Sequence, residues 1–160
     1  MTSNLVTALA VSGTNLFAGT MGNGIFLSTD NGTSWIQIDS GLSTNTGNDY
    51  VYVYALAIYP NGAGGTNLFA AQGIHGLFLS TNNGTSWTSA DSGLTSIDIF
   101  SFAVNGTNLF VGTSGSGVSL STNNGASWTS DSTGLSNNWG YSDANALIVS
   151  GTYLYWIKTD

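Results

Sequence analysis

The chain lacks several residue types on which common functions depend. Its 160 residues include no Cys, no Glu and no Arg, and Lys158 is the single basic residue besides one His. Without Cys, neither a disulfide framework nor a thiolate metal site can form, and cysteine usage does not indicate a redox compartment. Nucleic-acid binders neutralise phosphates with Lys and Arg, and peripheral membrane proteins usually present a basic face. We therefore expect no nucleic-acid partner, no acidic ligand and no cofactor.

The remaining composition is that of a folded domain. Apolar residues make up 41% of the chain and aromatic residues 12%, which argues against disorder in a chain of this length. No apolar run approaches the roughly 18 residues of a membrane span, and no basic and apolar leader follows Met1. We expect no membrane insertion and no signal peptide within this chain. Ser, Thr, Asn and Gly form about half of it, and such a polar, nearly uncharged surface favours an extracellular or cell-surface location.

Two phrases recur along the chain at a fixed offset. An eight-residue phrase occurs at Ser28–Trp35, Ser80–Trp87 and Ser121–Trp128. Each copy follows a Thr-Asn-Leu-Phe phrase, which begins at residues 14, 66 and 107, by the same number of residues. A fixed offset between two recurring phrases indicates one structural unit that is copied along the chain.

Each unit reads as four short antiparallel strands. In the first copy these are expected at 6–11, 15–20, 25–28 and 34–38, with turns at Gly13 and at Asp30-Asn31-Gly32. No helical period occurs. The second copy runs from 54 to 89 and the third from 100 to 130, while a fourth starts at 146 and ends after its second strand.

The spacing of the copies predicts an all-β fold, a β-propeller of four-stranded antiparallel blades. Successive copies start about 40 to 50 residues apart, which is typical of propeller blades. The chain is then a single partial propeller of about three and a half blades. Its expected parts are blade 1 at about 5–40, blade 2 at about 52–91, blade 3 at about 98–131 and a half blade at about 143–160.

The eight-residue phrase is predicted to reverse the chain between the third and fourth strands. Asp30 offers a carboxylate that accepts hydrogen bonds from turn N–H groups, and Gly32 supplies a positive φ. Trp35 then re-enters the sheet and covers the turn. The later copies carry Asn82 and Asn123 in place of Asp30. Because an amide accepts the same bonds but cannot serve as an anionic ligand or nucleophile, a structural role is favoured over metal binding or acid catalysis.

This phrase resembles the Asp-box, also called the BNR repeat. The first copy matches the pattern at Ser28, Asp30, Gly32, Ser34 and Trp35. The other copies match except at the Asp position, with the residues Ser80, Asn82, Gly84, Ser86, Trp87, Ser121, Asn123, Gly125, Ser127 and Trp128. The resemblance implies a propeller like those of sialidases, sortilin-type receptors, some glycoside hydrolases and bacterial surface proteins. It also implies that the boxes lie away from the ligand-binding face.

The resemblance does not extend to sialidase catalysis. Sialidases hold the substrate carboxylate with an arginine cluster and use a Tyr/Glu pair and an Asp, whereas this chain has no Arg and no Glu. Other glycosidases need two carboxyl groups beside the sugar bond. Asp49, Asp98 and Asp143 precede first strands on the expected ligand-facing rim. We expect no catalysis and interpret these aspartates as solvated or turn-capping residues, with glycosidase activity as the weaker alternative.

The same rim holds the other candidates for ligand binding. His75, without Cys or several carboxylates beside it, cannot form a zinc site, so we predict no metal site. Tyr50, Trp139 and Tyr141 lie in links that lead into new blades. Their rings can either stack on a sugar or pack between blades. A carbohydrate-binding, lectin-like propeller with glycan partners is therefore the alternative function.

Three and a half blades leave the ring incomplete. Open blade faces and strand edges aggregate or find partners. The chain is either a piece of a longer propeller, or pairs with a second copy to complete a ring, or assembles further by exchanging strands. Bulky residues replace small ones in the last strand, and we expect self-association through Tyr153, Tyr155, Trp156 and Ile157.

The leading prediction is a non-catalytic extracellular module of structural or protein-interaction type. It would self-associate to complete a propeller or to build a larger, filamentous surface assembly.

Overall fold

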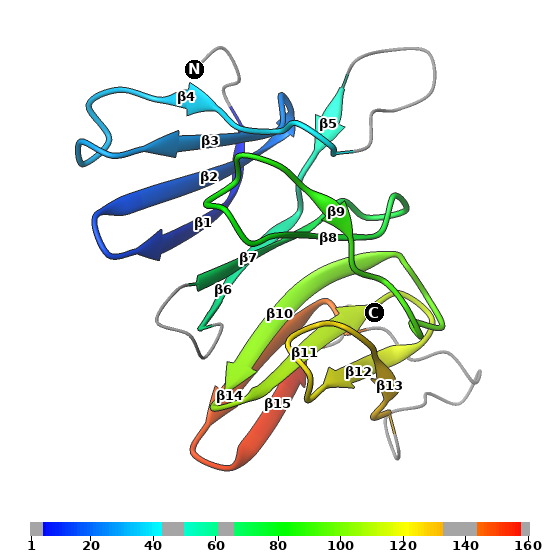
Figure 1. The fold of residues 1–160 in the computed structure, drawn as a ribbon. Coiled ribbons are helices and arrows are strands. Elements are labelled where there is room, and N and C mark those ends of the chain that lie inside the picture. Colours follow the sequence, from blue (N-terminus) through cyan, green and yellow to red (C-terminus); the bar gives the residue numbers. More distant parts are fainter. Residues whose placement is uncertain (1–4, 43–49, 61–65, 133–143, 158–160) are drawn as a thin grey trace.

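The computed structural model describes residues 5–42, 50–60, 66–132 and 144–157. Within these ranges the chain forms strands and turns, and it contains no helix long and apolar enough to cross a membrane. The strands form three antiparallel sheets, each with four strands in chain order and the first with a short fifth strand, and one two-stranded hairpin (Figure 1). The predicted fold class, an all-β partial propeller of four-stranded blades, is confirmed.

Each sheet is a blade whose strands follow one another in chain order. Blade 1 contains β1 (Val6–Ser12), β2 (Asn15–Gly22), β3 (Ile25–Ser28) and β4 (Ile36–Gln37). Blade 2 contains β6 (Ala55–Pro60), β7 (Thr66–Ala71), β8 (Leu77–Ser80) and β9 (Thr88–Ser89). Blade 3 contains β10 (Ile99–Asn105), β11 (Asn108–Thr113), β12 (Gly117–Ser121) and β13 (Thr129–Ser130). The half blade contains β14 (Ala146–Ser150) and β15 (Tyr153–Ile157), and a short β5 (Val51–Tyr52) pairs with the end of β2.

The fourth strands are shorter than the predicted 34–38. In blade 1 the strand itself contains only Ile36 and Gln37, and the N–H of Ile38 donates to Ile25 of β3 just beyond it. Ser34 is held in the preceding turn instead, because its backbone N–H donates to Asp30 Oδ1 over 2.9 Å.

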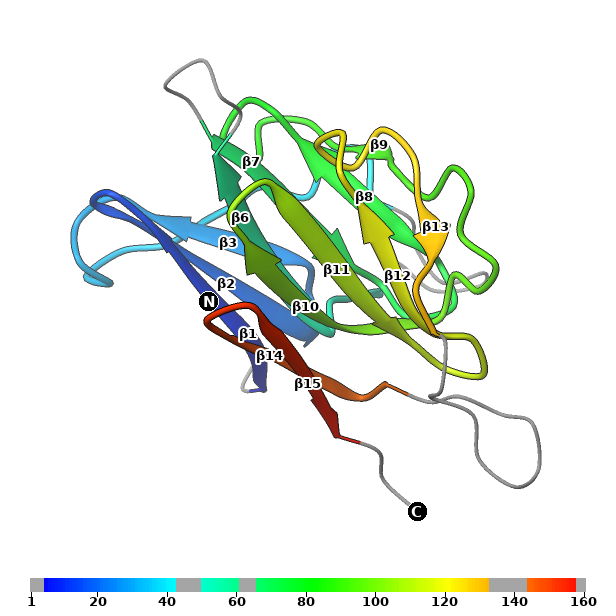
Figure 2. The ribbon, with the colours of Figure 1, turned by 90° about the horizontal axis from the view of Figure 1, so that it is seen from below.

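The blades stack along an open arc, with blade 1 at one end and the half blade at the other (Figure 1). Their first strands lie side by side in the order β1, β6, β10 and β14. Seen from below, the half blade lies beside β10 and β11 (Figure 2). Since side chains alternate across a strand, each blade has two faces. We call the face turned toward the following blade the forward face, and the opposite one the rear face.

The core consists of layers between neighbouring blades. Phe17 on the forward face of blade 1 packs with Leu68 and Phe78 of blade 2. Phe69 on the forward face of blade 2 packs in the same way with Leu109 of blade 3. The third layer joins Ala103, Phe110 and Val118 of blade 3 to Leu147, Val149 and Leu154 of the half blade. Each blade is thus stabilised chiefly by its neighbours.

The links between blades run tightly over small residues of the preceding blade. A Cβ atom at Gly19 would lie 2.7 Å from the Val53 side chain, and one at Gly112 would lie 2.1 Å from the Ala144 carbonyl oxygen. Val53 donates its N–H to Thr20, and Ala144 donates to Thr113. The glycines in β2 and β11 are therefore required by the path of the next link.

Candidate functional site

The eight-residue phrase forms a tightly bonded turn between the third and fourth strands, which we call the repeat turn. In blade 1, Ser28 Oγ donates to Asp30 Oδ1 over 2.8 Å and accepts the N–H of Gly32 over 2.8 Å. Ser34 Oγ donates to Asp30 Oδ2 over 2.6 Å. Asn31 and Gly32 both have positive φ values, 57° and 86°, which Asn and Gly adopt most readily.

The Asn copies reproduce these bonds with one reversal. Asn82 Oδ1 accepts the N–H of Ser86 over 3.0 Å, while its Nδ2 donates to Ser86 Oγ over 2.9 Å. Asn123 makes the same pair of bonds with Ser127. The seryl hydroxyl donates to the carboxylate in blade 1 and accepts from the amide in the other blades. The side chain at this position therefore serves the turn whether or not it is charged.

The turn changes the acidity of Asp30. Hydrogen bonds from the side chain and backbone of Ser34, and from Ser28, stabilise the carboxylate and lower the pKa of Asp30 to about 2. Asp30 is thus ionised at neutral pH, and its carboxylate accepts three hydrogen bonds from Ser28 and Ser34 within the turn.

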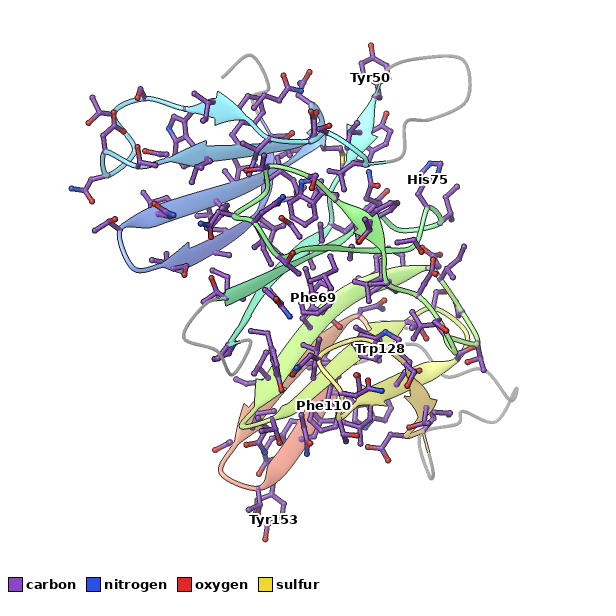
Figure 3. All side chains as sticks on the ribbon, in the orientation of Figure 1. Tyr50, Phe69, His75, Phe110, Trp128 and Tyr153 are labelled. Carbon is purple, nitrogen blue, oxygen red and sulfur yellow. The ribbon has the colours of Figure 1, made fainter. Side chains whose placement is uncertain are left out.

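The repeat-turn tryptophans of blades 2 and 3 join each blade to the one before it. Trp87 donates its indole N–H to the Ile38 carbonyl over 2.6 Å and its backbone N–H to Ser40 over 2.9 Å. Trp128, labelled in Figure 3, makes the equivalent bonds to Ala90 and Ser92. Both side chains are 3% exposed. We call this pair of bonds the tryptophan clasp.

Trp35 has no preceding blade in this chain and makes no clasp. Its indole N–H donates to Gly32 of its own turn over 3.1 Å, and its side chain is only partly buried. The sequence predicted that Trp35 covers its own turn, and Trp35 does bind that turn. The prediction did not include the bonds that Trp87 and Trp128 make to the preceding blade.

A sequence signal for the clasp exists in the residues that follow each repeat turn. Ser40-Gly41-Leu42 and Ser92-Gly93-Leu94 recur after blades 1 and 2. A Cβ atom at Gly41 would lie 2.4 Å from the Trp87 carbonyl oxygen, and one at Gly93 would lie 2.5 Å from that of Trp128. The recurring Gly thus makes room for the Trp of the next blade.

The predicted ligand-binding residues within the described ranges lie at the rim opposite the repeat turns. Tyr50 precedes β5 and is 51% exposed, with its ring centroid 6.2 Å from that of Tyr52. His75 lies in the β7–β8 loop, on the same side of the molecule as Tyr50 (Figure 3). Asp98 lies against Gly73 of that loop, and its burial raises the pKa of the carboxyl group. Asp49, Trp139, Tyr141 and Asp143 lie outside the described residues.

No pocket is found over the part of the chain that the structure describes. Nor do these residues contain a group of three or more His, Cys, Asp or Glu placed to hold a metal ion.

The two ends of the blade stack expose apolar faces, and the strands β1, β2, β14 and β15 that form them contain no charged residue. The rear face of blade 1 exposes Leu9 and Val11, and we call it the head face. The forward face of the half blade, the tail face, exposes Ile148, Tyr153, Tyr155 and Ile157. In Figure 3, Tyr153 points away from the blades at the free hairpin.

The four residues predicted to self-associate do not share one face. Tyr153, Tyr155 and Ile157 are exposed on the tail face. Trp156 lies on the opposite side of β15, where it pairs with Leu147 and is partly buried. It points toward the side on which the half blade meets blade 3.

Comparison with known proteins finds no family model and no curated protein that matches the chain. Solved structures do match. The extracellular domain of BT4673 from B. thetaiotaomicron aligns over 97% of this chain and 19% of its own, with 16% identity and a TM-score of 0.67. The computationally designed protein Ika4 aligns over 99% of this chain and 94% of its own, with 15% identity and a TM-score of 0.60.

An ancestral GH74 enzyme aligns over 79% of this chain and 18% of its own, with 22% identity and a TM-score of 0.57. The chain thus spans about a fifth of the BT4673 and GH74 chains and nearly all of Ika4. At these identities the matches define the fold, and the fold is that of propeller blades.

Proposed function

We propose that the chain is a non-catalytic module of the Asp-box propeller class that works through self-association at its open blade faces. The observation that carries the proposal is the exposure of repeat positions that are buried elsewhere in the same chain. Tyr155 occupies the position of Phe17, Phe69 and Phe110, as the strand registers define it. Those three rings are at most 7% exposed, whereas Tyr155 is 53% exposed.

Membership of the Asp-box class is supported by the shared geometry of the three repeat turns. In each turn the first Ser binds both the Asp or Asn and the Gly, and the Asp or Asn binds the second Ser. An extracellular or cell-surface location is supported by the charge-poor surface and by the likeness to an extracellular domain.

The proposal that the module is non-catalytic is supported by the hydrogen bonds that three of its carboxylates accept within the fold. Asp30 is bound within its turn. The carboxylates of Asp39 and Asp91 accept hydrogen bonds from the neighbouring Gln37 and Ser89 side chains over 2.6 and 2.7 Å. The likeness to a GH74 enzyme supports only the shared fold.

Size-exclusion chromatography with light scattering over a wide range of concentrations tests the proposal. We expect particles heavier than the 16.5 kDa chain at micromolar concentration. A monomer that stays monodisperse at every concentration would contradict self-association.

A second candidate, glycan binding, is favoured by the exposed Tyr50 ring beside Tyr52. Exposed aromatic rings can stack on sugars. The experiment is a glycan array with the wild type, Tyr50→Ala and Trp139→Ala. Glycan signals that disappear in a variant which keeps the wild-type mass would establish this second function, and an array without signals would remove it.

A further inference from the structure

Every blade contact inside the chain joins unlike faces. Phe69 on the forward face of blade 2 lies with its ring centroid 6.5 Å from that of Phe102 on the rear face of blade 3. The strand registers place Tyr155 in the position of Phe69, and Leu9 in that of Phe102. Tyr155 is on the tail face and Leu9 is on the head face, where Leu9 is 70% exposed. The chain thus carries both halves of this contact at opposite ends.

From this pairing we infer that two copies of the chain meet head to tail, with Tyr155 of one copy against Leu9 of the other. The inference rests on the proposed self-association and names the two surfaces that meet. The occupant of each open face is a second copy, because the contact continues the stacking that the chain already uses three times.

Polar contacts at one edge of each interface fix the register of the pairing. One repeat position binds the first hairpin of the next blade. It is the last residue of β1 and β10 and the last but one of β6. Ser12 Oγ lies 3.3 Å from Thr66 Oγ1, Tyr59 donates its hydroxyl proton to the Thr107 carbonyl, and Asn105 Nδ2 donates to the Gly151 carbonyl over 3.2 Å. Ser150 holds this position on the tail face. In the proposed pair it meets the β1–β2 turn of the second copy.

The chemistry of the two faces suits this contact. The strands β1, β2, β14 and β15 contain no Asp, Glu, Lys or Arg. Burying Leu9, Val11, Ile148 and Tyr155 therefore removes apolar surface from water, and no charge on these strands is desolvated.

The tail face differs from the internal forward faces in one respect that also favours a second copy. Ile157 stands where blades 1, 2 and 3 have the small residues Gly19, Ala71 and Gly112. Those glycines lie under the link to the next blade, which leaves no room for a side chain. Ile157 fills the space that such a link would cross. A partner that arrives as a separate copy needs no link there.

A head-to-tail contact can be recognised from the masses of two variants, one changed on the head face and the other on the tail face. Each variant alone loses the contact, and a mixture of the two restores it. In contrast, an isologous contact joins the same patch of both copies, and only one of the two faces would then matter. The experiment therefore uses Leu9→Asp as the head variant and Tyr155→Asp as the tail variant, with circular dichroism to show that each is folded. Ile74→Asp, which removes an exposed apolar residue from the β7–β8 loop, is the matched control.

Light scattering should give each face variant alone the mass of a single chain. The equimolar mixture should give twice that mass, because the tail of the head variant still fits the head of the tail variant. Ile74→Asp should keep the wild-type mass.

The inference is overturned if either face variant alone keeps the wild-type mass, or if the mixture stays monomeric. In those cases a wild type that associates leaves the proposed function intact. A wild type that is monomeric at all concentrations overturns both.

Discussion

Trp128 and Trp35 stand at the same repeat position, yet one is nearly inaccessible and the other is partly exposed. Trp128 lies between two blades and donates its indole N–H to Ala90 of the preceding one. Trp35 lies at the end of the stack and donates to its own turn. Phe69 and Tyr155 differ in the same way, because Phe69 is buried between two blades and Tyr155 is exposed at the end of the stack. A repeat of this kind specifies half of an interface, and its neighbour supplies the other half.

The largest difference is expected when the two tryptophans are removed separately. Trp128→Ala should lower the free energy of unfolding by about 3–5 kcal/mol, as for other buried large-to-small changes. Trp35→Ala should cost roughly 1–2 kcal/mol, since less of its surface leaves water. Urea denaturation at a fixed protein concentration measures both values. Equal losses would mean that the tryptophan clasp adds nothing to the stability that the indole side chain provides.

The glycine under the clasp sharpens the same comparison. Gly93 has a φ of 86° and lies under Trp128, whereas Gly106 has a φ of 59° and no atom within 4 Å of a built Cβ. Both Ala variants carry the cost of a left-handed residue. Gly93→Ala should cost about 1–3 kcal/mol more, because its methyl group over-packs the clasp. Denaturation curves that coincide would contradict this role of Gly93.

The repeat turn of blade 1 should differ from those of blades 2 and 3 in its response to acid. Because the folded pKa of Asp30 is lowered to about 2, its ionised form stabilises the fold above about pH 4, and this contribution is lost as the pH falls toward 2. Asp30→Asn, which copies the inner turns, should abolish that loss and leave the stability at pH 7 nearly unchanged. Melting temperatures between pH 2 and 7 measure the effect.

Asp30→Ala serves as the control for that experiment. It should be destabilised at pH 7, because the N–H and hydroxyl of Ser34 lose their partner. An Asn variant as unstable as the Ala variant would show that the turn needs the charge.

The smallest effect is expected at Asp98, which precedes Ile99, the buried first residue of β10. Burial raises its folded pKa, so its contribution to stability is greatest at low pH and declines as the pH rises through that pKa. Asp98→Asn should therefore slightly raise the melting temperature at pH 7 and leave it unchanged at pH 3. A lower melting temperature at pH 7 would indicate that the carboxylate binds a partner in the fold.

The blades could be predicted from the sequence because their signals are local. The repeat turn lies within eight residues, and the strands on either side follow from the hairpin signals. The tryptophan clasp could not be predicted in the same way. Trp87 and its acceptor Ile38 are 49 residues apart, and only the stacking of blades brings them together.

The exposed apolar faces were harder to predict, because the exposure of a side chain depends on whether a neighbouring blade covers it. Leu9 and Leu56 share one repeat position, but Leu9 is exposed and Leu56 packs into a core. The grouping of Trp156 with Tyr155 overlooked the alternation of side chains along β15, which places them on opposite faces.

The links that run over Gly19 and Gly112 also govern how the molecule comes apart. Val53 and Ala144 are nearly inaccessible and bind the blade before their own, so a blade cannot leave without pulling its entry residue out of its neighbour. In the single chain, unfolding should accordingly proceed from the two ends inward. Amide hydrogen exchange would record that order as slow exchange in β7 and β11 and faster exchange in β15.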